Sequence, residues 1–201
     1  MEPLDEVRSL ERLRRAAIDE FAARGFEGAN IGRIARAAGM SKKTVYRFVS
    51  SKEDLFLSTA EERLGASIYA ALSAAPLGTA CEARLRLLLF GFGTLALSDD
   101  GIAFYRLMMR DGIRFPQIAN GYADAMTRGV IAPLEAILRD GCATGEIIVT
   151  DANRAARTLL SMTFSEPMHD AALGLDVART ASDVEDIIGF ALGIFMDGCA
   201  A

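Results

Sequence analysis

The sequence predicts an all-α protein of about nine helices, with a small N-terminal head and a larger C-terminal body. Hydrophobic residues make up 51% of the 201 residues and charged residues 24%, which are values of a globular chain. Alanine and leucine are abundant and β-branched residues are fewer, a balance that favours helix over strand. Apolar residues recur every three or four positions, and short stretches with glycine or proline separate these periodic segments.

The first helix is predicted from about Asp5 to Arg24, with Gly25 ending it. Its apolar positions form one stripe, which we expect to pack across the helices that follow. A head of about 50 residues is near the lower limit for a core of its own, so it should also pack on the next helix. The stripe consists of Leu10, Leu13, Ala17, Ile18 and Phe21.

Residues 30–56 have the pattern of two short helices joined by a glycine turn and followed directly by a third helix. Asn30 and Ser41 are predicted N-caps of the two short helices, and Gly39 stands where a left-handed residue usually ends a helix. Ser51 begins an S-x-x-D pattern that opens the third helix. Two short helices around a tight turn form a helix-turn-helix, which places its second helix in the major groove of DNA.

The charge of this stretch supports the same interpretation. Residues 24–52 contain seven basic residues against Glu27 alone, a net charge of +6 in a chain whose net charge is −5. Lys42 and Lys43 fall in the first turn of a predicted helix, where the helix dipole disfavours cations by about 0.3–1 kcal/mol each. Local stability therefore does not explain them, whereas a phosphate backbone would attract them.

The stretch SKKTVYRFVSSKEDLF resembles the signature of the TetR family of transcriptional regulators, and the strong match covers about 50 of the 201 residues. Lys43, Phe48 and Ser50 depart from residues that are frequent in that family. Phe48 has no donor for a phosphate. The resemblance implies transcription regulation by a cytoplasmic, homodimeric repressor, with a DNA-binding domain at residues 1–50 and a ligand-binding and dimerisation domain at 51–201.

The residues expected to contact DNA lie on or beside the second short helix. Arg47 is the candidate for bidentate reading of guanine, and Lys52 is expected to meet a backbone phosphate. Tyr46 is open to a second interpretation as half-buried packing. The full predicted set is Asn30, Lys42, Lys43, Thr44, Tyr46, Arg47 and Lys52.

The body is predicted to contain the remaining helices. Pro116 is expected to open a long helix towards Asp140 or Cys142, in which Pro133 should cause a kink or leave a carbonyl near Gly129 unpaired. No linker separates the head from the body, so one helix should belong to both and act as a lever. The other predicted helices run over residues 51–74, 81–97, 99–111, 151–172 and 182–199.

Two kinds of partner are expected for the body. Aromatic and methionine side chains suit an apolar pocket for a small molecule, although the same residues are also ordinary core formers. The last two helices carry more apolar residues than one stripe needs, among them Ile187 and Ile188, and are expected to form a homodimer interface. The candidate pocket residues are Phe90, Phe104, Met108, Tyr122, Met126, Met162 and Phe164.

Several classes of function find no support in the sequence. There is no nucleophile elbow, phosphate loop or metal-ligand spacing, so an enzyme is not predicted, and no cofactor or metal is expected. Cys81, Cys142 and Cys199 are widely spaced and suit a reducing compartment as buried thiols, with a thiol sensor as the alternative. No membrane span or signal peptide is predicted. The remaining alternatives are a DNA-binding regulator without a ligand and an activator.

Overall fold

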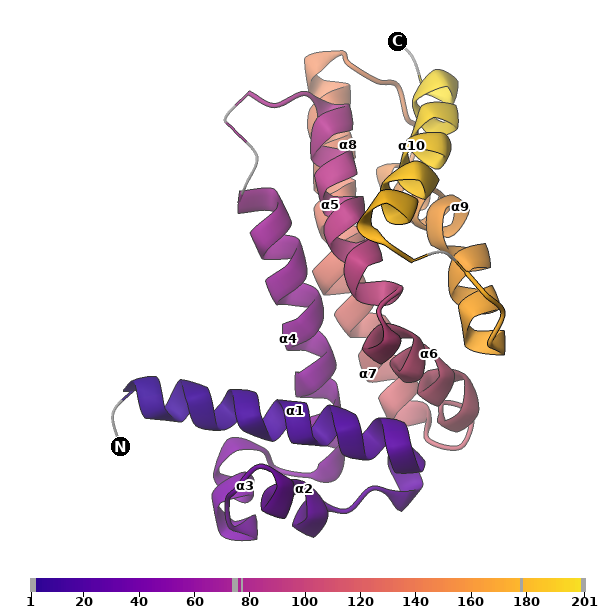
Figure 1. The fold of residues 1–201 in the computed structure, drawn as a ribbon. Coiled ribbons are helices and arrows are strands. Elements are labelled where there is room, and N and C mark those ends of the chain that lie inside the picture. Colours follow the sequence, from indigo (N-terminus) through magenta and orange to yellow (C-terminus); the bar gives the residue numbers. More distant parts are fainter. Residues whose placement is uncertain (1–2, 74–75, 77, 178, 200–201) are drawn as a thin grey trace. The chain divides into compact units, whose positions relative to one another are not determined.

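We analysed a computed structural model of the chain, which describes residues 3–73, 76, 78–177 and 179–199 (Figure 1). These residues form ten α-helices and one π-helical turn, and none of them lies in a β-strand. The π-helical turn joins two helices without a break, so nine continuous helical rods result, in agreement with the prediction. The elements are α1 (Pro3–Gly28), α2 (Ile31–Ala37), α3 (Lys42–Phe48), α4 (Lys52–Ser73), α5 (Cys81–Ala96), α6 (Asp99–Asp111), α7 (Pro116–Met126), η1 (Thr127–Ile131), α8 (Ala132–Thr144), α9 (Ala152–Leu173) and α10 (Ala181–Gly198).

The signals that predicted the helix ends are confirmed. Asn30 Oδ1 accepts hydrogen bonds from the backbone at the start of α2, and Ser41 Oγ does the same for α3. Gly39 has φ 69°, and Met40 N donates to Ala35 O at 2.9 Å, which closes the end of α2. Gly25 has φ 73° and ψ 174°, so it interrupts α1 where the regular helix was expected to end. The predicted end of α4 at residue 74 lies outside the described residues.

Pro133 is accommodated in a way that the sequence did not predict. It stands at the start of α8, directly after the π-helical turn η1. In this turn Ala132 N donates to Thr127 O, five residues earlier, instead of to the usual fourth residue. The wider turn absorbs the change in hydrogen bonding that a proline imposes, so the helical path continues through it.

The chain divides into two compact units, and neither is one continuous stretch. The first unit comprises the residues up to Glu62 together with Ala103–Ala123, and the second comprises Arg63–Ile102 and the residues from Asp124 onward. Helices α4, α6 and α7 therefore each have one end in each unit. The helix that we expected over residues 51–74 is α4, whereas the division of α6 and α7 between the units was not predicted.

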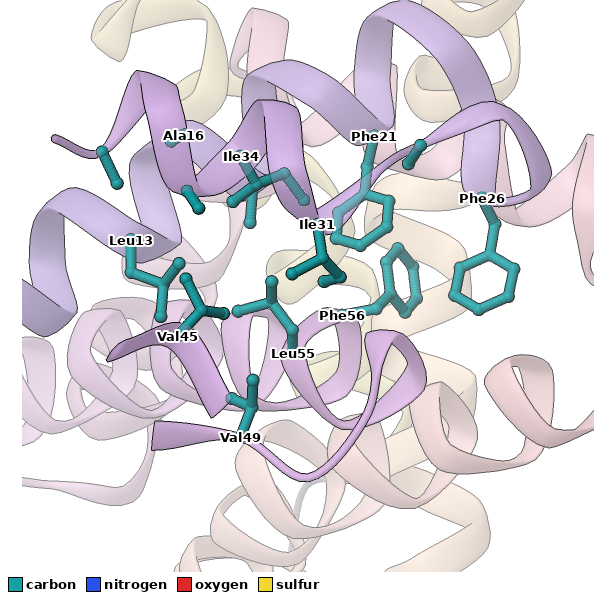
Figure 2. Packing of buried hydrophobic residues seen from close by; sticks show 14 of the residues in the cluster. Leu13, Ala16, Phe21, Phe26, Ile31, Ile34, Val45, Val49, Leu55 and Phe56 are labelled. Atoms are coloured by element: carbon teal, nitrogen blue, oxygen red, sulfur yellow. The ribbon is translucent and has the colours of Figure 1, made fainter. Parts of the chain in front are cut away.

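The first unit has its core between α1, α2, α3 and the start of α4 (Figure 2). Leu13, Ile34, Val45 and Leu55 are fully buried there. A row of aromatic rings extends this core towards α6 and α7: the ring centroids of Phe26 and Phe56 are 5.7 Å apart, those of Phe56 and Phe104 4.9 Å, and those of Phe104 and Tyr122 5.4 Å. Residues from α6 and α7 thus share the core of the helix-turn-helix.

The second unit is built on α5, α8, α9 and α10, which pack on one another. Gly93 on α5 allows close approach, because a Cβ there would lie 2.7 Å from the ring of Phe164 on α9. Ile188 on α10 is fully buried within the chain, so it is a core residue and not a candidate for contact with a second subunit. The large apolar residues that α10 exposes are Phe190 and Ile194, which sequence reasoning had not singled out.

The described residues were also compared with the requirements of a membrane span and of a metal site. No single described helix is long and apolar enough to cross a membrane, and only the bent pair of α5 and α6 meets that description jointly. Likewise, no group of three or more His, Cys, Asp or Glu residues in the described part of the chain is placed to hold a metal ion.

Candidate DNA interface

Helix α3 presents one face to solvent and anchors the other in the core. Val45 is fully buried and fixes the rotation of the helix. Lys43, Tyr46 and Arg47, at positions i, i+3 and i+4, are exposed on the opposite face, and 53% of Tyr46 is accessible. The exposure of Tyr46 decides against the half-buried interpretation of this residue.

The seven cations of residues 24–52 fall into three groups, one of which is Lys52, whose ammonium binds backbone carbonyls. Arg24 and Arg33 pair with Glu20, which lies on α1 outside the stretch whose charge was counted. In the described part of the chain, by contrast, no carboxylate forms an ion pair with the remaining four cations. These are Arg36, Lys42, Lys43 and Arg47. The uncompensated charge is therefore concentrated on α3 and the end of α2.

Glu20 joins α1 to the start of α2, and sequence reasoning missed it. Its Oε1 accepts a hydrogen bond from Arg33 Nε at 2.8 Å and another from Asn30 N at 3.1 Å. Burial disfavours the charged carboxylate, but the hydrogen bonds from Arg33 and Asn30 outweigh it, so the pKa of Glu20 lies below its ordinary value. Arg33 also donates to Gly28 O at 2.6 Å, so its guanidinium is bound to the backbone just before α2.

Three residues of the predicted DNA-binding set, Asn30, Thr44 and Lys52, also have partners inside the protein. Asn30 Oδ1 accepts hydrogen bonds from Gly32 N at 2.8 Å and Arg33 N at 3.3 Å. The Thr44 hydroxyl lies 2.9 Å from Ser41 Oγ, and Thr44 is half-buried. Each of these contacts lies at the start of one helix of the motif, α2 for Asn30 and α3 for Thr44.

The Lys52 side chain has three contacts inside the protein. Its Nζ donates to Glu27 O and to Ala29 O, both at 3.3 Å, and lies 4.7 Å from the centroid of the Phe26 ring. The ammonium thus ties the start of α4 to the end of α1 through two carbonyls and a cation–π contact. No sequence signal marks this role, because the partners lie 23 or more residues away in the chain.

The seven candidate pocket residues divide between the two units. Phe104, Met108 and Tyr122 belong to the first, where Phe104 stacks on Phe56. Burial raises the pKa of the Tyr122 hydroxyl to about 12, with a further contribution from Tyr105. The other four, which belong to the second unit, are Phe90, Met126, Met162 and Phe164.

The environments within that second group differ. Phe164 is buried, and its ring lies 5.3 Å from that of Phe92 in an edge-to-face contact. Met162, on the same helix, is 43% exposed. Phe164 is therefore part of the packing between α5 and α9, whereas Met162 belongs to the surface of α9.

A helix-turn-helix whose second helix exposes a cationic face is typical of DNA-binding proteins, and comparison with known proteins identifies the family. Residues 13–59 match the family described as bacterial regulatory proteins, tetR family, and residues 83–199 match the C-terminal domain described as that of AefR-like transcriptional repressors. The chain belongs to the TetR family of transcriptional regulators. It is therefore a regulator and not an enzyme.

Individual relatives agree with this assignment. The fatty acid metabolism regulator protein of Bacillus subtilis is 26% identical over 153 residues, which are 75% of this chain and 77% of that protein. The flavonoid-responsive regulator FrrA has a TM-score of 0.72 at 29% identity, covering 96% of this chain and 97% of FrrA.

Two crystal structures share the fold. A TetR-family regulator of Mesorhizobium loti has a TM-score of 0.78 at 24% identity, covering 97% and 98% of the two chains. The regulator FadR of Bacillus subtilis, solved with stearoyl-CoA, has a TM-score of 0.74 at 19% identity, covering 94% and 98%.

Proposed function

We propose that the protein is a homodimeric repressor that binds a palindromic operator and is released from it by a small apolar or amphipathic molecule. The observation that carries this proposal is the exposed face of α3, where Lys42, Lys43 and Arg47 have no carboxylate partner among the described residues. In this proposal residues 1–50 bind DNA and residues 51–201 bind the ligand and the second subunit, while Ala103–Ala123 packs with the first unit.

The proposed DNA contacts divide by their surroundings. Lys43, Tyr46 and Arg47 are exposed on one face of α3 and are assigned to base edges and phosphates. Lys42 lies beside the start of α2, since a Cβ on Gly32 would be 2.5 Å from its Cε, and is assigned to phosphate. Asn30, Thr44 and Lys52 act mainly by holding the motif together, in view of their internal hydrogen bonds.

The second subunit is assigned to the outer face of α10. Phe190 is 76% exposed and Ile194 51%, and they lie four residues apart on one face. A Cβ on Gly193, between them, would meet nothing within 4 Å, so a partner helix could approach closely there. A dimer would bring two recognition helices to half-sites about one or more DNA turns apart, roughly 34–36 Å or a multiple of it.

The class of effector is inferred from relatives. A protein 26% identical to this chain is named as a regulator of fatty acid metabolism, and FrrA, 29% identical, is named as flavonoid-responsive. Both names indicate molecules with a large apolar part. Stearoyl-CoA, present in the FadR structure of the same fold, is therefore the first compound to test, with a flavonoid as the second.

The first experiment is selection of binding sites from random DNA by the full-length protein. Arg47→Ala should then weaken binding to the selected site by about 1–3 kcal/mol and relax the preference at one base pair per half-site. Arg154→Ala, at a residue of α9 whose side chain is 86% exposed, is the matched control and should change nothing. If Arg47→Ala binds the site like the wild type, α3 is not the recognition helix.

Dimerisation and release are tested separately. Phe190→Asp should give monomers in sedimentation, whereas Val7→Asp, at an exposed apolar residue of α1, should not. A persistent Phe190→Asp dimer would place the interface elsewhere. Stearoyl-CoA should weaken operator binding by the wild type. Tight binding with every apolar compound tested would favour the alternative of a regulator without a ligand, and a rise in transcription on binding would favour an activator.

A further inference from the structure

The last residue of α6 contacts the end of α1 through a buried hydrogen bond. Gly25 leaves the helical region of backbone space and interrupts the hydrogen-bond ladder of α1, so the next backbone N–H needs another acceptor. Asp111, 85 residues further along the chain and 5% exposed, supplies it: its Oδ2 accepts from Phe26 N at 2.7 Å. A side chain from α6 thus caps the last turn of α1.

Asp111 is held in this position by its neighbour. Arg110 Nε donates to Asp111 Oδ1 at 2.8 Å, and Arg110 Nη2 donates to Oδ2 at 3.2 Å. The hydrogen bond from Arg110, and after it the one from Phe26 N, hold the pKa of Asp111 below its ordinary value although burial opposes this. A Cβ on Gly25 would lie 2.1 Å from Arg110 Nη2, so the glycine leaves room for the pair.

Two further contacts join the same segments. Arg114 donates to both carboxylate oxygens of Glu27, at 2.7 and 3.1 Å, and the rings of Phe115 and Phe26 meet edge to face at 5.0 Å. The Lys52 ammonium, at the start of α4, lies over the Phe26 ring in a cation–π contact. We call the contacts of residues 110–115 with residues 25–27 the α6–α7 latch.

We propose that the α6–α7 latch sets the position of the helix-turn-helix, and that Asp111 is the positioning residue through which a change in α6 or α7 reaches the DNA-binding surface. This rests on the proposed ligand response. Both helices have one end in the second unit, and residues at their junction contact the end of α1. From there Glu20 and Arg33 connect α1 to α2, and Lys52 connects it to α4.

The test compares Asp111→Ala and Asp111→Asn in the full-length protein. Alanine removes the acceptor for Phe26 N, whereas asparagine keeps a carbonyl oxygen at the same place. Asp99→Ala is the matched control, because the Asp99 carboxylate at the other end of α6 is 93% exposed and pairs with Arg179 in the second unit. Amide hydrogen exchange is followed in peptides covering residues 26–37 and, as a measure of global folding, in peptides covering residues 84–96.

In Asp111→Ala we expect exchange over residues 26–37 to accelerate at least about fivefold while residues 84–96 stay unchanged, with Asp111→Asn between it and the wild type. Operator affinity should change in the same order, and any weakening of operator binding by stearoyl-CoA should be lost in Asp111→Ala. Exchange or operator affinity in Asp111→Ala within twofold of the Asp99→Ala control would overturn the proposal.

The exchange measurement keeps this inference separate from the proposed function. If the wild type binds no selected DNA site, the proposed function fails, and unchanged exchange in Asp111→Ala would then dismiss the latch as well. If the wild type binds DNA but ignores every effector tested, Asp111 still has to alter operator affinity, and an unaltered affinity would overturn its positioning role.

Discussion

Gly25→Ala tests how strongly the end of α1 depends on one backbone conformation. At φ 73° and ψ 174°, Gly25 occupies a region that is essentially restricted to glycine, and an alanine there costs about 1–3 kcal/mol. The new Cβ would also lie 2.1 Å from Arg110 Nη2 and 2.9 Å from Asp111 Oδ2. Displacing Asp111 leaves Phe26 N without its acceptor, which costs about 1–3 kcal/mol more.

The free energy of unfolding should therefore fall by about 2–6 kcal/mol, measured by urea denaturation with circular dichroism at 25 °C. Gly145→Ala is the matched control. Gly145 also has a positive φ, 77°, but its ψ of 14° is left-handed helical and a Cβ there would meet nothing within 4 Å. Gly145→Ala should lower the free energy of unfolding by about 1–2 kcal/mol. If Gly25→Ala destabilises the protein no more than Gly145→Ala does, the strain and the clash have been misjudged.

Two further predictions follow from titratable groups. Because the folded-state pKa of Asp111 is lowered, its charge stabilises the fold above the ordinary pKa of about 3.9, and this stabilisation is lost as the pH falls through the folded-state value. The stability advantage of the wild type over Asp111→Asn should be constant between about pH 7 and pH 5 and shrink below about pH 4; an advantage that grows in acid would contradict this. Burial, and after it the charge of Glu146, raises the pKa of the Cys81 thiol to about 11. Iodoacetamide at pH 8 should therefore alkylate the half-buried Cys142 well before Cys81, and mass spectrometry of the labelled peptides measures this order. Equal labelling of the two thiols in the native protein would show that Cys81 is not sequestered.

Local signals account for the parts of the fold that were predicted correctly. Asn30, Gly39 and Ser41 specify the ends of α2 and α3 through bonds to backbone groups within six residues, so a short stretch of sequence contains all the information. The π-helical turn before Pro133 was not predicted. A proline in the sequence indicates that the helical hydrogen-bond pattern must change, but not which new pattern the backbone adopts. The same holds for α10, where periodicity revealed an excess of apolar residues but did not show which of them the subunit itself buries.

By itself the sequence determined the all-α class and the helix-turn-helix, since these depend on spacing, caps and composition over short distances. The family was indicated by the resemblance of the stretch SKKTVYRFVSSKEDLF to the TetR signature. Only the tertiary structure decided which cations are uncompensated, because Glu20 reaches Arg33 from another helix. It also decided that Asp111 and Phe104 serve the DNA-binding unit, through contacts with Phe26 and Phe56 that span 85 and 48 residues of chain. Such contacts arise from packing that brings distant segments together, and no local pattern encodes them.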